Sequence, residues 1–448
     1  MQKQPSPAWV ITGGTPLKGS VRVSGAKNAS FKLMIAALFG DQESKILNLP
    51  DISDVAMVAK IINLLGAKAH SAGEGTQIID PTGLNSFAID QQYGEVSRAS
   101  TLFIAPLLAR FGEARVPLPG GDKIGKRPLE RHLAGLQKMG AKISQEGKLL
   151  VIQTEQLIGT RYRFAKNTHT GTETLLMAAV LAKGKTVLEN AAQEPEVDDL
   201  IKFLVTMGAK ITRTKPRTIE IEGVDHLAGA THKVMPDRNE AVSYACAALA
   251  SRGDIIVENA RAEDLTAFLN KLTEIGAGFE ILDYGIRFYY QGLLKATNVQ
   301  TDIYPGFMTD WQPLWAVLMC HAQGKSQIHE TVMQNRFQYV EVLRQMGAKI
   351  TAVTPELPLD PEQFYNFNWS DARDTDVRAI EITGPTQFHG GQFVAHDLRA
   401  GAITLIAAIS GVGETLLGGI EEIRRGYSAI DEKLRLLGAK IRHQKRVE

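Results

Sequence analysis

The chain has 448 residues, of which 44% are hydrophobic and 22% charged, and its formal net charge is +1. These values are typical of a globular protein of two or three domains, and so small a net charge gives no case for binding nucleic acid or an anionic membrane. The longest apolar stretches, such as 404–409, are too short to span a bilayer. Because the segment 1–7 has no apolar signal core, we expect a cytoplasmic protein.

The two cysteines, Cys246 and Cys320, both lie in apolar runs. We expect buried structural thiols at both positions, since free cysteine packs as a small apolar residue. The sequence has neither a disulfide framework nor the Cys/His spacing of a metal site, so no metal is expected.

A short motif built on Gly-Ala recurs six times, each time after an amphipathic run and before a short β-like segment. Its copies lie at 65–68, 139–142, 207–210, 275–278, 346–349 and 437–440. Successive glycines are 74, 68, 68, 71 and 91 residues apart, by subtraction of their sequence numbers. A period of this length corresponds to a complete folding unit, so the chain is predicted to contain six copies of one α/β unit.

Each unit is predicted to begin with a helix rich in small residues that ends near a glycine. In chain order these helices are expected at 29–39, 99–110, 172–182, 241–251, 311–322 and 400–410. A second helix, capped by the repeated glycine, comes after a short strand such as 185–188, 254–257 or 414–417. Alternating patterns such as 218–221 predict the closing strands. Further strands are expected before the first unit, at 8–12, and at the end of the last, at 440–445.

One such unit is too small to bury a core alone, so several units must share a core. Six units divide naturally into two domains of three, with the join near 235–237. We expect two pseudo-threefold domains with a cleft between them, which is where substrates usually bind in proteins of two domains.

Charged and polar residues are found where the six opening helices begin. They are Lys27, Asn28, Arg98, Thr170, Thr172, Asp237, Arg238, Asp310, Asp397 and Arg399. Helix N-termini present unpaired amides and a positive dipole end, so the cations added there predict an anion-binding site. The alternative for Asn28, Thr170 and Asp310 is that each is an ordinary N-cap.

The loop 117–128 is rich in glycine and cations and is too polar to belong to a core. Glycine loops of this kind can be mobile lids over a site. The chain contains no Walker loop, no dinucleotide-binding fingerprint after a strand and no serine-elbow motif, so none of these motifs assigns its chemistry.

Several short segments together resemble the enolpyruvyl transferases, and the resemblance covers nearly the whole chain. The segments are 24–29, 98–100, 118–121 with 127–128, 189–192, 236–238, 309–310, 330–332 with 335–337, 397–400 and 425–427. The resemblance implies an α/β fold, a two-domain inside-out α/β barrel with three βαβαββ repeats in each domain. The implied domains are 21–236, which contains the lid loop, and 1–20 together with 237–448, with the active site in the cleft between them.

The resemblance is strongest to the members that act on UDP-N-acetylglucosamine. It implies transfer of the enolpyruvyl group of phosphoenolpyruvate to the sugar 3′-hydroxyl, with release of phosphate, as the first committed step of peptidoglycan synthesis. Phosphoenolpyruvate and UDP-N-acetylglucosamine are then the partners. No metal or organic cofactor is implied, since phosphoenolpyruvate supplies the activated group. The sequence leaves the oligomeric state open.

The resemblance also assigns roles to individual residues. Asp310 is implied as the general base for the sugar hydroxyl, in a catalytic set completed by Asp122, Lys27 and Arg399. Cations suit the phosphate and carboxylate of phosphoenolpyruvate, whose implied contacts are Lys27, Asn28, Arg127, Arg399 and Arg425. The implied contacts of the nucleotide-sugar are Asn28, Arg98, Arg127, Pro128, Leu129, Lys166, Thr168, Asp310 and Val332.

The sequence departs from the family pattern in the lid. The position usually occupied by a reactive cysteine is Asp122. This carboxyl group could act as a general acid, or Asp122 could be a lid residue only. Because fosfomycin alkylates the cysteine, the resemblance implies that fosfomycin will not inactivate this protein.

Two further departures lie at 167–173 and 355–378. The first segment is more polar than the commonest family form, so a paralogous transferase that uses another nucleotide or sugar stays open as an alternative. The second accounts for the 91-residue spacing, and its Asp-rich part, 371–376, is expected to be an exposed surface loop and not a metal site. A catalytically silent, nucleotide-sugar-binding regulator is the other alternative, against which the retained cations and Asp310 argue.

Overall fold

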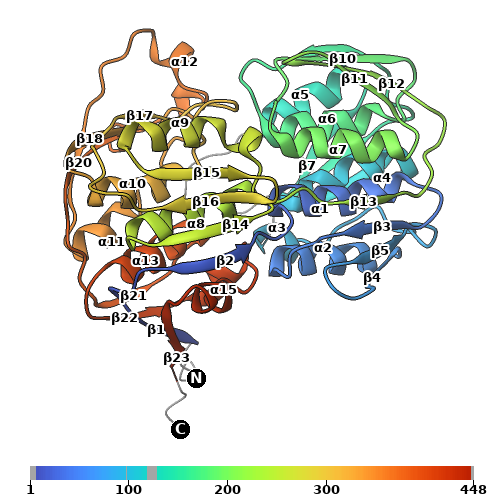
Figure 1. Ribbon diagram of the computed structural model, residues 1–448. Coiled ribbons are helices and arrows are strands. Elements are labelled where there is room, and N and C mark those ends of the chain that lie inside the picture. Colours follow the sequence, from blue (N-terminus) through green and yellow to red (C-terminus); the bar gives the residue numbers. More distant parts are fainter. Residues whose placement is uncertain (1–6, 97, 119–128, 445–448) are drawn as a thin grey trace. The chain divides into compact units, whose positions relative to one another are not determined.

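The computed structural model describes residues 7–96, 98–118 and 129–444, without the side chains of 95, 96 and 98 (Figure 1). The described chain forms two compact units. One contains the residues up to Ser24 together with those from Pro236 onward, and the other contains the described residues from Gly25 to Met235.

Three sheets belong to the unit from Gly25 to Met235. In spatial order, the strands of the first sheet are β13 (Thr231–Lys233), β3 (Ser44–Leu47), β5 (Gln77–Asp80) and β4 (Lys68–Ser71). Those of the second are β6 (Glu113–Pro117), β8 (Leu149–Gln153) and β7 (Lys142–Glu146). Those of the third are β11 (Lys210–Lys215), β12 (Thr218–Glu222), β10 (Lys185–Glu189) and β9 (Arg161–Arg163).

The other unit also has three sheets. In the same spatial order, the first contains β15 (Gly278–Leu282), β16 (Gly285–Tyr289), β14 (Asp254–Glu258) and β2 (Lys18–Arg22). The second contains β17 (Val299–Gln300), β18 (Gly324–His329), β20 (Ala379–Gly384) and β19 (Lys349–Val353). The third contains β21 (Gln392–Val394), β22 (Glu414–Gly418), β1 (Ala8–Thr12) and β23 (Lys440–His443).

The six sheets share one pairing scheme, as six related repeats require. In each four-stranded sheet, three neighbouring strands are antiparallel, and a fourth strand at the edge pairs parallel to its neighbour. In the sheet that contains β2, the strands β15, β16 and β14 are antiparallel and β2 pairs parallel to β14. The last sheet keeps the scheme although β1 comes from the other end of the chain. β1 pairs antiparallel with both β22 and β23, so that Trp9 faces Leu417 on one side and His443 on the other.

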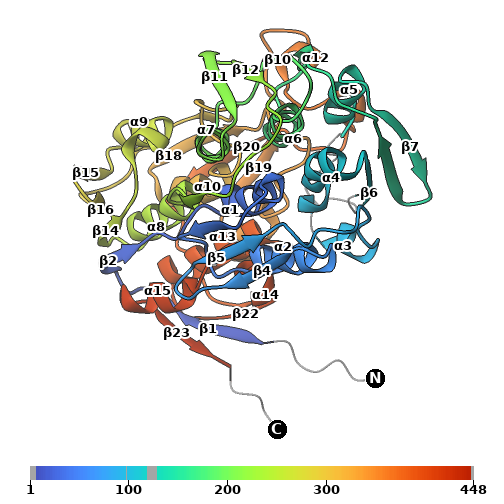
Figure 2. The same cartoon turned by 90° about the vertical axis from the view of Figure 1, so that its right-hand side faces the viewer.

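The opening helices of the repeats form the interior of each unit. They are α1 (Lys27–Ala36), α4 (Ile104–Phe111) preceded by η2 (Arg98–Phe103), and α6 (His169–Ala179) in one unit, and α8 (Arg238–Ala250), α10 (Gln312–His321) and α13 (Leu398–Ser410) in the other. Every residue of α8 is buried, and α8, α10 and α13 pack against one another. A helix that is buried on every side belongs to a core. The predicted inside-out architecture, with helices inside and sheets outside, is confirmed; Figure 2 shows α6 and α7 beside β10, β11 and β12.

The second helices of the repeats end as the motif predicts. They are α2 (Ser53–Leu64), α5 (Glu130–Lys138), α7 (Pro195–Thr206), α9 (Thr266–Ile275), α11 (Val340–Gln345) and α15 (Ile430–Leu436). All six motif glycines have a positive φ, between 75° and 111°. In five copies the following alanine donates its N–H to a carbonyl five residues back, as Ala141 does to Leu136, which is the Schellman pattern. The predicted glycine caps are therefore confirmed.

The remaining helices are short. They are η1 (Ala37–Phe39), α3 (Gln92–Val96), η3 (Ala262–Leu265), α12 (Pro361–Phe364), η4 (Trp369–Asp371) and α14 (Ile420–Arg424).

The predicted surface loop 371–376 has no buried residue, but the part of the segment 355–378 before it is packed. Tyr365 and Phe367 are buried, and the ring of Tyr365 stacks on Trp369 with a centroid distance of 5.3 Å. The guanidinium of Arg378 lies over the ring of Trp369, 4.5 Å from its centroid. The Tyr365 hydroxyl lies 3.0 Å from Nε2 of His329 on β18. Aromatic packing against the repeat therefore orders the part of this segment that precedes the Asp-rich loop.

Both cysteines are buried and free, as predicted, and burial raises the pKa of the Cys320 thiol to about 12. Within the described residues, no helix is long and apolar enough to cross a membrane. The same part of the chain contains no group of three or more His, Cys, Asp or Glu side chains placed to hold a metal ion.

Candidate active site

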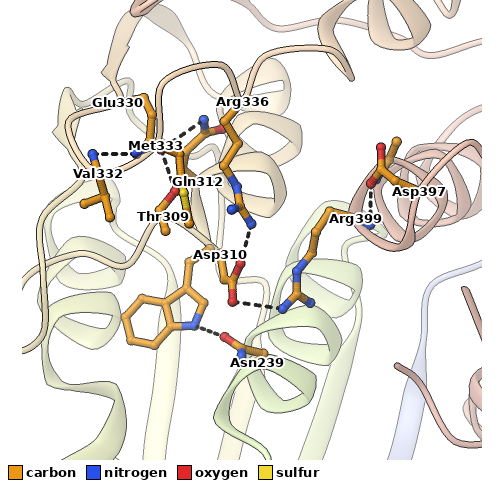
Figure 3. Close-up of polar contacts among 12 residues, drawn as sticks. Asn239, Thr309, Asp310, Gln312, Glu330, Val332, Met333, Arg336, Asp397 and Arg399 are labelled. Carbon is orange, nitrogen blue, oxygen red and sulfur yellow. Dashed lines mark hydrogen bonds and ion pairs between the residues drawn. The ribbon is translucent and has the colours of Figure 1, made fainter. Parts of the chain in front are cut away.

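Asp310 is held by two arginines in the unit that contains Pro236 onward (Figure 3). Its Oδ2 lies 3.1 Å from a terminal nitrogen of Arg399, and its Oδ1 accepts a hydrogen bond from Arg336. The Arg336 side chain is only 5% exposed, and those of Asp310 and Arg399 are 19% and 18% exposed. Two guanidinium groups therefore converge on one carboxylate that stays accessible to a small molecule. Such a cluster can bind an anion, and it contains a carboxylate that can accept a proton.

Local structure explains why Arg399 points to this place. Asp397 is the N-cap of α13, and its Oδ1 accepts hydrogen bonds from the N–H groups of Arg399 and Ala400 at 2.8 and 2.9 Å. The cap fixes the first turn of the helix, and Arg399 lies in that turn. Asp237 caps α8 in the same way, accepting from the N–H groups of Asn239 and Glu240.

A chain of hydrogen bonds supports Arg399 from behind. Its Nη1 donates to the hydroxyl of Tyr427 at 3.1 Å, and this hydroxyl lies 2.7 Å from Oγ of Ser243. Ser243 donates its own proton to the carbonyl of Asn239, so Tyr427 must be the donor to Ser243. Successive donors in one direction polarise and strengthen one another. This series of hydrogen bonds joins the first turn of α13 to the first turn of α8 through the buried hydroxyl of Tyr427.

Electrostatics keep this network in one charge state. Burial disfavours the charge of Arg399, but Asp310, Tyr427 and Asp237 outweigh burial, so the pKa of Arg399 is raised above its usual value. Burial also raises the pKa of Tyr427, although Arg399 and Ser243 oppose that shift. Arg399 therefore stays a cation and Tyr427 stays a neutral donor at neutral pH.

A buried glutamate organises the loop next to Asp310. Glu330 Oε1 accepts hydrogen bonds from the N–H groups of Val332 and Met333 at 2.8 and 2.9 Å. Its Oε2 accepts from the hydroxyl of Thr309 at 2.8 Å and from the amide of Gln312 at 3.4 Å. Glu330 thus joins the backbone at Val332 to the residues on either side of Asp310 (Figure 3).

Sequence patterns had assigned roles to Asp310, Arg399 and Val332, but none to Arg336, Glu330, Tyr427 or Ser243. Arg336, Glu330 and Tyr427 lie within segments that resemble the enolpyruvyl transferases, so a signal was present. Arg425 lies at the end of α14 with Nη1 3.1 Å from Glu422 Oε2. It is two residues before Tyr427 and therefore close in the chain to the support of Arg399.

In the unit from Gly25 to Met235, Lys27 and Asn28 are the first two residues of α1. Lys27 Nζ lies 2.7 Å from Oδ2 of Asp54, in the first turn of α2. Leu129 precedes α5, and Lys166 and Thr168 precede α6. These five predicted site residues all lie at or just before helix starts.

The alternative that Asn28, Thr170 and Asp310 are ordinary N-caps is wrong for all three. Asn28 lies inside α1, which begins one residue earlier, and Trp311 precedes α10 in the cap position without a side-chain hydrogen bond. The cap of α6 is Thr168, whose Oγ1 accepts from the N–H of Gly171 at 3.2 Å. Helix α6 therefore begins three residues before the predicted 172, because the earlier threonine supplies the cap.

Several predicted site residues lie outside the described part of the chain. They are Asp122, Arg127 and Pro128 of the lid loop, together with the side chain of Arg98.

Comparison with known proteins identifies this architecture. The family model described as EPSP synthase (3-phosphoshikimate 1-carboxyvinyltransferase) matches residues 11–434. A UDP-N-acetylglucosamine 1-carboxyvinyltransferase of Oleidesulfovibrio alaskensis is 40% identical over 433 residues, which are 97% of this chain and 98% of that protein. The protein of the same name from Desulforapulum autotrophicum is 40% identical over 435 residues, 97% of this chain and 99% of its own.

Two solved structures share the fold. The enolpyruvyl transferase NikO of Streptomyces tendae superimposes with a TM-score of 0.85 at 23% identity, covering 98% of this chain and 99% of its own. An EPSP synthase of Acinetobacter baumannii gives 0.70 at 18% identity, covering 98% and 100%. The fold is that of the enolpyruvyl transferases. The chain belongs to the EPSP synthase family of carboxyvinyltransferases.

Proposed function

We propose that this protein transfers the enolpyruvyl group of phosphoenolpyruvate to the 3′-hydroxyl of UDP-N-acetylglucosamine and releases phosphate. The observation that carries the proposal is the pair of arginines converging on Asp310, in a chain 40% identical to proteins named for this reaction. The reaction would take place in the cytoplasm as a step of peptidoglycan synthesis, and would need no metal.

The cations match the substrate. Phosphoenolpyruvate has a phosphate and a carboxylate in a small volume, and arginine binds either group through two parallel hydrogen bonds. We assign its binding to Lys27, Asn28, Arg127, Arg399 and Arg425, residues that come from both units. The carboxylate of Asp310, held by Arg336 and Arg399, occupies a position that a substrate carboxylate would compete for.

Asp310 would accept the proton of the sugar hydroxyl as its oxygen attacks C2 of phosphoenolpyruvate. C3 gains a proton in the same addition, which gives a tetrahedral intermediate. Loss of that proton from C3 and departure of phosphate then form the enolpyruvyl ether. A carboxylate paired with two guanidinium groups is a weak base, so Asp310 gains basicity when an anionic substrate draws an arginine away.

The nucleotide-sugar contacts are assigned to Asn28, Arg98, Arg127, Pro128, Leu129, Lys166, Thr168, Asp310 and Val332. Asp122 would supply a proton or close the site as a lid residue. We propose that two domains together perform this reaction, expected from the sequence at 21–236 and at 1–20 with 237–448; the two compact units have their first boundary four residues later, after Ser24.

Phosphate release from phosphoenolpyruvate tests the proposal, with UDP-N-acetylglucosamine compared against UDP-glucose, UDP-N-acetylgalactosamine and UMP. We expect release with UDP-N-acetylglucosamine and an enolpyruvyl product of matching mass. Release only with another acceptor would make the protein a paralogue with different specificity. No release with any of them would contradict the proposed activity.

Fosfomycin should not inactivate the protein, because Asp122 replaces the thiol that the drug alkylates. We expect unchanged activity after prolonged incubation, measured by phosphate release. The matched variant is Asp122→Cys, which should become sensitive. Time-dependent inactivation of the unaltered protein, with a covalent adduct seen by mass, would show that another nucleophile is exposed at the site.

Replacing Tyr427 by Phe should lower kcat/KM for phosphoenolpyruvate about tenfold, the value of one hydrogen bond to a charged group. The ring would still fill its buried place, while Arg399 would lose the hydroxyl that orients it. Tyr365→Phe is the matched control, since it removes a buried hydroxyl next to His329 in the same unit. Equal effects of the two variants would show that Tyr427 serves stability alone.

A further inference from the structure

Three ionisable side chains meet inside the unit from Gly25 to Met235, separate from the residues assigned to catalysis. Lys32 Nζ on α1 lies 2.5 Å from Glu173 Oε1 on α6 and 3.0 Å from Nε2 of His169. His169 Nε2 in turn lies 3.1 Å from the same oxygen of Glu173, one helical turn along. The Lys32 and Glu173 side chains are 4% and 0% exposed, whereas 23% of the His169 side chain is exposed.

One nitrogen cannot satisfy both of its neighbours at once. If Nε2 of His169 has no proton, it accepts from the ammonium of Lys32 but faces Glu173 as a second acceptor. If Nε2 has a proton, it donates to Glu173 and faces Lys32 as a second donor. The cluster therefore has two hydrogen-bonding arrangements, and the proton on His169 selects between them.

The surrounding charges favour the protonated arrangement. Burial disfavours the imidazolium and Lys32 repels it, but Glu173 and Glu194 together outweigh both, so the pKa of His169 is raised above its usual 6.5. Glu194, just before α7, is 7% exposed, and its Oε2 has no hydrogen-bond partner among the described residues; neither does Oε2 of Glu173. On the α5 side, His132 packs against Gly171. A protonated His169 therefore adds a second cation beside Glu173, which already pairs with Lys32, and is also attracted by Glu194.

The cluster joins the two helix starts assigned to substrates. Lys32 lies one turn after Asn28 on α1, and His169 directly follows the cap residue Thr168. The segment before α6 is firmly held, because the buried Asn167 amide donates to the carbonyl of Asn190 at 3.0 Å and Thr172 Oγ1 donates to the carbonyl of Thr168 at 2.8 Å. A change of charge at His169 therefore occurs at a fixed place, directly after Thr168 and three residues after Lys166.

We propose that Lys32, Glu173 and His169 form a positioning cluster for the nucleotide-sugar subsite, and that the charge of His169 sets the affinity for the anionic nucleotide-sugar. This inference rests on the proposed function, since that function places the nucleotide-sugar at 166–168. A cation one residue from this segment favours a diphosphate ligand, so affinity is high when His169 is protonated. It falls as the pH rises through the raised pKa, where the charge is lost.

Isothermal titration of UDP-N-acetylglucosamine into the full chain, from about pH 6 to about pH 9, tests the cluster. The Kd of the unaltered protein should rise about tenfold over this range. His169→Gln should bind about tenfold more weakly at the low end and show little pH dependence. It keeps the Lys32–Glu173 ion pair, so it should fold. A neutral double variant, Lys32→Met with Glu173→Gln, should also bind weakly without leaving a buried charge unpaired.

His232→Gln is the matched control. It removes a histidine–carboxylate contact of 3.0 Å, to Asp199, in the same unit but on β13. Its Kd and pH dependence should match those of the unaltered protein. An unchanged Kd and pH dependence in both His169→Gln and the double variant would overturn the inference. Binding that depends on His169 in a protein that releases no phosphate would uphold the inference and reject the proposed function, whereas no binding at any pH would reject both.

Discussion

Asp310→Asn is expected to bind both substrates and to lose about 100-fold or more in the rate of the chemical step, the usual contribution of a general base. The amide keeps one oxygen, which can accept from Arg336 or from Arg399, while its NH2 group can only donate, and it cannot take the proton of the sugar hydroxyl. Single-turnover phosphate release measures the chemical step, and equilibrium titration of UDP-N-acetylglucosamine measures binding.

A control is needed because Arg336 is buried and loses a charged partner. Thermal unfolding should show that the variant is folded at the assay temperature. Asp254→Asn removes a similar carboxylate, which pairs with Arg287 at 2.7 Å on the surface of the same unit, and should leave turnover unchanged. Single-turnover release at the unaltered rate in Asp310→Asn would exclude the base role.

The second large effect is expected from Arg399→Lys, which keeps the charge and removes the planar fork. An ammonium cannot face Asp310, the Tyr427 hydroxyl and a substrate anion with the fixed geometry of a guanidinium. Truncating one partner of such a charge pair costs about 2–5 kcal/mol. We therefore expect kcat/KM for phosphoenolpyruvate to fall about 100-fold.

Steady-state kinetics with phosphoenolpyruvate as the varied substrate measure this loss. Arg287→Lys is the matched control, since Arg287 also pairs with an aspartate through two nitrogens, at 2.8 and 2.7 Å, but away from the site. Turnover like that of the unaltered protein in Arg399→Lys would show that charge alone is needed at this position, and would remove the argument from geometry.

The repeats were predictable because the glycine that ends each second helix is recognisable from a few neighbouring residues. A glycine with positive φ after an amphipathic helix leaves a signal in a few residues, and Gly66, Gly140 and Gly208 all adopt that conformation. The first residue of a helix was harder to predict from the sequence. Thr168 and Thr170 are both acceptable caps by residue type, and only the packed structure shows that Thr168 accepts the hydrogen bond from Gly171.

The sequence did not indicate which residues contact one another to support the site, although Tyr427 lies in a segment that resembles the enolpyruvyl transferases. Tyr427 and Ser243 are 184 residues apart, and Lys32 and Glu173 are 141 apart. No spacing rule in one sequence joins residues at such distances. The segment 355–378 shows the same limit, since Tyr365 and Phe367 are buried in spite of the polar residues around them. Sequence patterns could indicate that Arg399 binds an anion. Only the fold shows that Tyr427 and Asp310 orient its guanidinium.

Strand β1 has a consequence for how the protein is made. Trp9 is completely buried between β22 and β23, which the ribosome produces only after almost all of the remaining chain. The described residues from Gly25 to Met235 all belong to one unit, which can fold as soon as it has emerged. The other unit must wait, with the apolar side chains of β1 exposed, until its partners arrive. We therefore expect the unit from Gly25 to Met235 to fold first. The sheet that contains β1 can form only after β22 and β23 have been synthesised.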